Sequence, residues 1–311
     1  MNIHIDGAGL PEHLLDAARD GLDAIAVTDV TLLVTDSFTD RVRGLDNNPD
    51  YRADRGAGVV AARTMHTSDG HIIVVNAPQL RRRDPADIER LLAHEGGHVL
   101  LGGRGEDIAL RVRPARLTRW QWLLYCLGAI GIEEYRIEAA LSELGYGESE
   151  TCDIEHLEST MSTLNEEILG SVLDPATSGD PLELERRVIH AQQWLVKFLA
   201  CVAPYRPARG LPALGVAAYA RENWGDYIGE HWQRRVEFYE SIPSAHEPLD
   251  ATDLDVVLRR GLVLEVELLR SLGFAYTTGT GGGYGFWRRG SNELFTRRVA
   301  RLRRELDDSA A

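Results

Sequence analysis

The stretch that most constrains this chain runs from residue 91 to 101 and contains the motif His94-Glu95-Gly96-Gly97-His98. If this stretch is helical, His94 and His98 lie four residues apart on one face, where two imidazoles can bind one zinc ion. Glu95 lies one step round the helix and can face a metal-bound water. The spacing therefore predicts a helix that carries two zinc ligands and a general base.

Flanking residues support this helix. Asp84 can serve as the N-cap, Pro85 suits the first helical position, and Asp87 places an acid in the first turn. The two glycines between the histidines are unusual, because each costs about 0.5–1 kcal/mol relative to alanine inside a helix. Close packing against a neighbouring element would explain them. The alternative is a surface helix with two solvated histidines.

The composition of the chain limits which binding partners and which cellular location we expect. The formal net charge of −14 and the pI near 5.2 argue against nucleic acid or an anionic membrane surface as a partner. Three cysteines without metal-site spacing favour a reducing cytoplasm, and the N-terminus lacks the features of a signal peptide. The longest apolar run, 120–132, is too short to cross a bilayer. Basic residues are nearly all arginine, and Lys197 is the only lysine, which we attribute to genome composition.

The N-terminal half alternates helical and β-rich patterns. Residues 11–26 have helical spacing of apolar side chains, 31–35 is a short strand, and 41–55 has the composition of a loop. Residues 58–64 and 71–76 predict a hairpin, because a turn sequence separates them. We expect the second of these strands to be an edge strand that lines the cleft and pairs with an extended peptide. We expect His71, at the start of this strand, to lie on the surface, and the alternative is that it faces the cleft.

A third metal ligand is expected in the long apolar helix predicted for 120–145, with interruptions conceivable at Gly128 and Gly131. Acidic side chains in such a helix are costly unless they are paired or bind a metal. Glu134 shares a helical face with apolar residues and is the favoured ligand, and Glu133 is the alternative. Glu138, one turn further on, is expected to orient a ligand histidine or to pair with an arginine.

H-E-x-x-H followed by a helical glutamate resembles the gluzincin branch of the zincin metallopeptidases. The predicted order of helix, strand, hairpin, motif helix and glutamate helix, over residues 10–145, is similar to the compact ImmA/IrrE-like family. The resemblance implies that His94, His98 and Glu134 bind Zn2+ and that Glu95 is the general base.

The C-terminal half is predicted to be a helical lobe that closes over the cleft, without a motif of known function. Its helical patterns cover residues 154–173, 182–202, 216–241 and 254–272. A Gly-rich segment, 277–285, is predicted to be a mobile lid loop between two helices. Tyr276 and Tyr284 would then reach the substrate or the ligand shell. The alternative is a disordered connector.

The sequence therefore predicts an α+β protein with a zincin-like domain, 1–150, and a helical lobe, 151–311. The expected function is cytoplasmic, zinc-dependent hydrolysis of a peptide, protein or small amide. Two alternatives remain: a non-catalytic zinc-binding sensor or scaffold, and a zinc enzyme that acts on a small metabolite.

Overall fold

The computed structural model describes residues 1–55, 58–68, 70–108, 111–149, 154–205, 218–279 and 283–309. The protein is of mixed α and β structure, as the sequence predicts. It divides into two compact units, of which the first comprises Met1–Leu110, Arg136–Gly147 and Ser244–Pro248, and the second the remainder. Helix α5 (Arg119–Glu143) belongs to both units, because the division falls between Tyr135 and Arg136 within this continuous helix.

The first unit is built on a small mixed sheet. Besides the end of α5, its elements are β1 (Asn2–Asp6), α1 (Glu12–Ala24), β2 (Thr31–Thr35), α2 (Phe38–Asp46), β3 (Asp54–Arg55), β4 (Gly58–Val59), β5 (Ala62–Thr67), β6 (Gly70–Asn76), α3 (Ala77–Leu80) and α4 (Pro85–Gly103). The strand order in the sheet is β1-β2-β6-β5, with β1, β2 and β6 parallel and β5 antiparallel to β6. The predicted hairpin is confirmed, but its first strand, β5, forms the edge of the sheet. The prediction that the second strand is the edge was wrong, because β2 pairs with the other side of β6.

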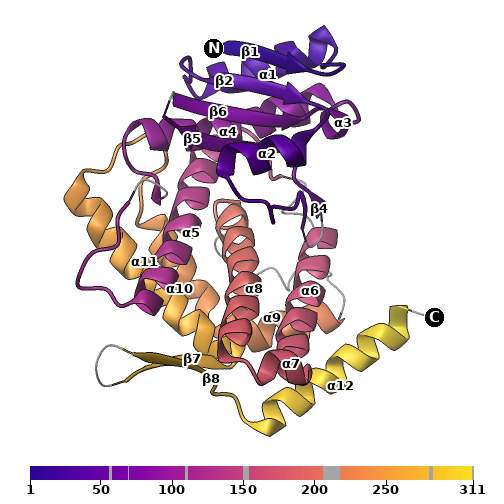
Figure 1. The fold of residues 1–311 in the computed structure, drawn as a ribbon, viewed down its shortest axis with the longest axis vertical. Coiled ribbons are helices and arrows are strands. Elements are labelled where there is room, and N and C mark those ends of the chain that lie inside the picture. Colours follow the sequence, from indigo (N-terminus) through magenta and orange to yellow (C-terminus); the bar gives the residue numbers. More distant parts are fainter. Residues whose placement is uncertain are drawn as a thin grey trace. The chain divides into compact units, whose positions relative to one another are not determined.

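The two faces of the sheet bury alternate residues of β6. Ile73 and Val75 join a core with α1 and α4, whereas Val74 joins a smaller core with α2. Figure 1 shows the helices α1, α2 and α4 beside this sheet. The prediction of a loop over 41–55 was wrong in part, because helix α2 covers this segment as far as Asp46. Only Phe38 and Val42 of α2 are buried, so the apolar pattern is too sparse to predict this helix from sequence.

Helix α4 is packed tightly between two other helices. A Cβ atom at Gly96 would lie 2.8 Å from Ile25 Cγ2, just beyond α1. A Cβ atom at Gly97 would lie 2.6 Å from Ile137 Cγ2 on α5. The glycine pair of the motif thus allows α1 and α5 to approach α4 on two sides, which explains its cost in helix propensity. Asp84 occupies the N-cap position, but its side chain makes no capping hydrogen bond.

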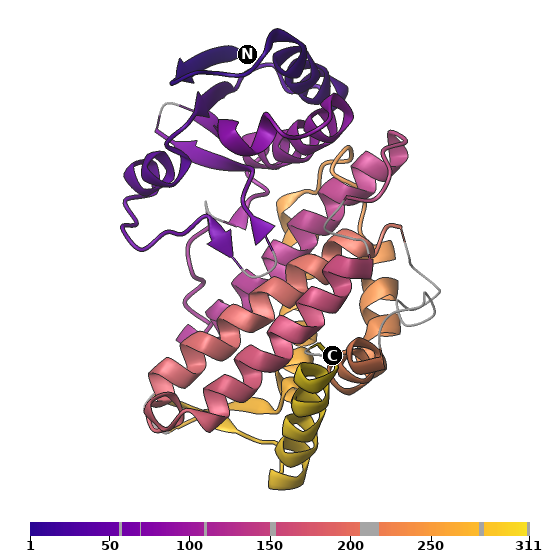
Figure 2. The same ribbon diagram turned by 90° about the vertical axis from the view of Figure 1, so that its right-hand side faces the viewer.

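The second unit is mainly helical. Besides the start of α5, its elements are α6 (Ile154–Leu173), α7 (Pro175–Ser178), α8 (Pro181–Val202), α9 (Ala218–Tyr227), α10 (Gly229–Glu240), α11 (Ala251–Leu272), β7 (Phe274–Thr278), β8 (Tyr284–Arg288) and α12 (Asn292–Ser309). Helices α6 and α8 lie side by side (Figure 2). Gly128 and Gly131 do not interrupt α5: a Cβ atom at Gly128 would lie 2.8 Å from the backbone of Gly261 on α11.

The Gly-rich segment forms part of a hairpin between α11 and α12. Strands β7 and β8 are antiparallel, with Thr278 paired to Tyr284, so the prediction of a loop over 277–285 was wrong at both ends. Residues 280–282 of that segment lie outside the described residues. The hydroxyls of Tyr276 and Tyr284 both contact the Glu185 carboxylate on α8, and Tyr276 stacks on Trp120. Across the described ranges, no helix combines the length and apolar character needed to span a membrane.

Candidate metal centre

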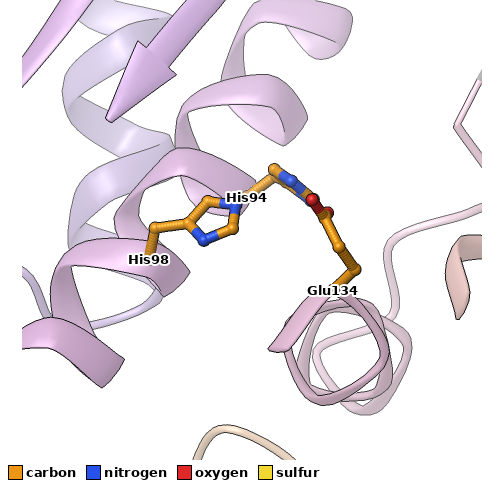
Figure 3. Close-up of side chains that lie close together, drawn as sticks. All are labelled: His94, His98 and Glu134. Atoms are coloured by element: carbon orange, nitrogen blue, oxygen red, sulfur yellow. The ribbon is translucent and has the colours of Figure 1, made fainter. Parts of the chain in front are cut away.

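Helix α4 presents both motif histidines from one face. Their ring centroids are 5.2 Å apart, and Figure 3 shows the imidazoles of His94 and His98 projecting from α4 toward Glu134 on α5. One nitrogen of each ring and one carboxylate oxygen of Glu134 lie within 4.8 Å of one another. No other such group of three histidine, cysteine or acidic side chains occurs in the described ranges. The structure therefore brings together the three residues expected to be ligands.

The phase of α5 places Glu134, and not Glu133, in this cluster. The side chain of Glu134 is only 6% exposed, and three residues further on Ile137 packs against Gly97 of α4. Glu134 and Ile137 lie on the same face of the helix, because three residues make nearly one turn. The contact between Gly97 and Ile137 thus helps to hold the carboxylate opposite the histidines.

Glu138 contacts the ligand histidine that the sequence suggested it would orient. Its Oε1 lies 2.9 Å from Nδ1 of His94, and its other oxygen accepts from the Arg90 guanidinium. Burial alone would raise the pKa of Glu138, but the bonds to His94 and Arg90 hold it below its usual value. An ionised Glu138 fixes the tautomer in which His94 carries its proton on Nδ1, so that Nε2 keeps its lone pair for a metal.

Glu95 is buried and is held by the edge strand. The backbone N–H of Thr64 on β5 donates to Glu95 Oε2 at 2.7 Å, and the Thr64 hydroxyl lies 2.6 Å from the same oxygen. The other oxygen, Oε1, has no hydrogen-bond partner among the described side chains and backbone groups, so it can accept a proton. Thr64 was not predicted, because its contact with Glu95 joins residues 31 positions apart.

Lys197 on α8 is a further residue that sequence reasoning missed as part of the site. Its ammonium group donates to Oε1 of Glu134. Burial alone would lower the pKa of Lys197, but the Glu134 carboxylate raises it above its usual value, so the amine stays charged. The only signal available in the sequence was that this is the sole lysine.

The donor set fits a divalent metal ion, and zinc is one such ion. Two imidazole nitrogens and one carboxylate oxygen are the ligands of many catalytic zinc sites, in which water takes the fourth position. The partner at His94 Nδ1 is also typical of zinc-binding histidines. A purely structural metal site has no open water position on which a carboxylate such as Glu95 could act.

A second group of histidines lies near the end of α4. Nδ1 of His66 lies 2.7 Å from Nδ1 of His71 across the β5–β6 hairpin, and His66 also pairs with Asp107. His71 was predicted to lie on the surface, but it is half-buried beside His66. Burial and the neighbouring His66 lower the pKa of His71. A Cβ atom at Gly102 would lie 2.3 Å from the His66 ring, so this glycine makes room for the pair.

Comparison of the chain with models of protein families, with curated proteins and with solved structures found no match.

Proposed function

We propose that this protein is a zinc-dependent hydrolase that cleaves a peptide or other amide bond. The observation that carries the proposal is the convergence of His94, His98 and Glu134, with Glu95 adjacent to the first histidine. The resemblance of the motif and the glutamate helix to gluzincins supports the same assignment, as does a small mixed sheet beside the motif helix. A zincin-like first unit follows from this proposal.

The chain supplies distinct groups for each part of such a reaction. When bound, the zinc ion would lower the pKa of a water molecule and polarise the substrate carbonyl. Glu95, with Oε2 fixed by Thr64, offers Oε1 to take the proton from that water and later to give it to the leaving nitrogen. Glu138 holds His94 in the tautomer that can bind the metal.

The edge strand β5 is the proposed place for an extended substrate. It lies at one side of the sheet and carries Thr64, which contacts Glu95. An extended peptide can add to such an edge by main-chain hydrogen bonds, which favours a peptide over a compact metabolite. Free Cys126 is consistent with a reducing cytoplasm, which we propose as the location of the protein.

The test compares Glu95→Gln with Glu89→Gln, a matched change on the same helix at a carboxylate that accepts from the Tyr146 hydroxyl, a bond that an amide oxygen can also accept. Bound zinc is measured by mass spectrometry of the metal, and hydrolysis with a mixed peptide library. We expect about one zinc per chain in both variants, because neither residue is a ligand. Glu95→Gln should lose hydrolysis by about 100- to 10,000-fold, because an amide cannot accept the proton.

Unchanged turnover in Glu95→Gln would refute the proposed function. Zinc binding by the wild-type protein without hydrolysis of any amide would favour the non-catalytic sensor or scaffold instead. Turnover of small amides alone would favour the metabolite enzyme.

A further inference from the structure

The only lysine of the chain contacts the candidate glutamate ligand. Lys197 lies on α8, and its ammonium group donates to Oε1 of Glu134. The Glu134 side chain is 6% exposed, whereas the Lys197 side chain is 39% exposed. Glu134 therefore does not cover the whole Lys197 side chain, and part of that side chain is accessible to a molecule that reaches the cluster.

Two other buried ion pairs among the described residues use arginine. Arg136 pairs with Glu106, and Arg235 with Glu265, in both cases with nearly complete burial. Arginine presents a planar fork that can occupy both oxygens of a carboxylate, whereas an ammonium group is a point donor with three N–H bonds. A lysine beside Glu134 can thus bind one oxygen, leave the second for a metal, and still have N–H bonds to donate.

Hydrolysis of an amide is faster when a hydrogen-bond donor, in addition to a metal, lies at the carbonyl oxygen. Negative charge develops on that oxygen as water attacks, and a donor positioned there in advance stabilises the transition state. Glu95 is an acceptor and cannot serve in this role. Among the groups described at the cluster, Lys197 is a charged donor that binds a ligand residue through one carboxylate oxygen and is partly exposed.

We propose that Lys197 is a catalytic residue that donates a hydrogen bond to the carbonyl oxygen of the scissile amide, an inference that rests on the proposed hydrolase function. The oxygen of water forms a bond to the carbonyl carbon, the π electron pair moves to the carbonyl oxygen beside the ammonium group, and Glu95 takes the water's proton. The carbonyl then re-forms, the C–N bond breaks, and the proton passes from Glu95 to the leaving nitrogen. The products are a carboxylic acid and an amine.

The kinetic test compares three variants with the wild-type zinc-loaded protein. Lys197→Met removes the charge, Lys197→Arg keeps it, and Arg187→Met removes a cation from the same helix that pairs with Glu183. For a peptide that the wild-type protein cleaves, we expect Lys197→Met to lower kcat by about 100- to 1000-fold with zinc retained. Lys197→Arg should recover part of the loss, and Arg187→Met should have wild-type turnover.

A second measurement follows the lysine directly in the folded wild-type protein. Because Lys197 is the sole lysine, a protein labelled with 15N-lysine has one side-chain ammonium resonance. Zinc should shift this resonance through Glu134. Inorganic phosphate, a tetrahedral oxyanion, should shift it again in the zinc-loaded protein and should bind at least tenfold more weakly to Lys197→Met.

The outcomes separate the two proposals. A wild-type protein that binds no zinc or cleaves no amide refutes the proposed function. Normal kcat in Lys197→Met, in a protein that does hydrolyse amides, overturns only the role of Lys197. A resonance that responds to zinc but not to phosphate would show that Lys197 positions Glu134 and does not touch the substrate.

Discussion

Replacing Gly97 by alanine tests whether the glycine pair of the motif positions the metal site. The added Cβ atom would lie 2.6 Å from Cγ2 and 2.8 Å from Cγ1 of Ile137. Because carbon atoms pack best at about 3.5–4.0 Å, α4 and α5 must separate by about 1 Å, or Ile137 must leave its rotamer. Overpacking of this kind costs about 1–3 kcal/mol, and the better helix propensity of alanine returns about 0.5–1 kcal/mol. We expect a net loss of up to about 2.5 kcal/mol in the free energy of unfolding.

The same displacement should weaken metal binding. Ile137 lies between Glu134 and Glu138 on α5, so a shift of the helix moves a candidate ligand and the partner of His94 together. Metal–ligand distances tolerate deviations of only about 0.2 Å. We therefore expect zinc affinity to fall by about 10- to 100-fold, the range observed when partners of metal ligands are lost. Urea unfolding and competition with a chelator measure the two effects.

Gly170→Ala on α6 is the matched control. A Cβ atom at Gly170 would meet no atom within 4 Å, so only the helix propensity changes and the protein should gain about 0.5–1 kcal/mol. If Gly97→Ala were as stable as this control and bound zinc normally, the account of the α4–α5 contact would be wrong.

Two further predictions concern buried charges. Burial alone would raise the pKa of Asp226, but Arg298 and Arg301 hold it below the usual 3.8, so its carboxylate contributes stability above about pH 4 that is lost as pH falls through the lowered pKa. Asp226→Asn should therefore lower the thermal unfolding midpoint more at pH 7 than at pH 3, and an equal effect at both values would contradict this. Arg136→Met should cost about 3–5 kcal/mol in urea unfolding, because it leaves the buried Glu106 without its cation. A loss below about 1 kcal/mol would show that the pair of Arg136 and Glu106 contributes little to stability.

Local signals explain which parts of the fold could be predicted. The motif helix, strand β2 and the β5–β6 hairpin follow from periodicity, a proline at the first helical position and a turn sequence. Strand β1 was not recognised, because it lies at the edge of the sheet and none of its residues is buried. The hairpin of β7 and β8 was hidden by the glycines between the strands, which favour a loop by composition.

The sequence also predicts only some of the residues of the candidate site. Spacing along one helix was enough to select His94, Glu95 and His98, because i and i+4 positions share a face. The residues that contact the site from other elements are different: Thr64, on the edge strand, binds Glu95, and Lys197, on α8, binds Glu134. Such partners are fixed by tertiary packing, so no local pattern indicates them. Lys197 was visible only as a compositional exception.

The phase of α5 leads to the last prediction, which ranks three glutamates by their effect on zinc binding. Glu134→Ala removes a candidate ligand and should lower zinc affinity by more than about 100-fold. Glu138→Ala removes the partner of His94 Nδ1 and should cost about 10- to 100-fold, since the ligands themselves remain. Glu133→Ala should have little effect, because this residue projects about a hundred degrees away from Glu134 round the helix. If Glu133→Ala lost zinc while Glu134→Ala retained it, α5 would turn a different face toward α4. The contact between Gly97 and Ile137 would then also be wrong.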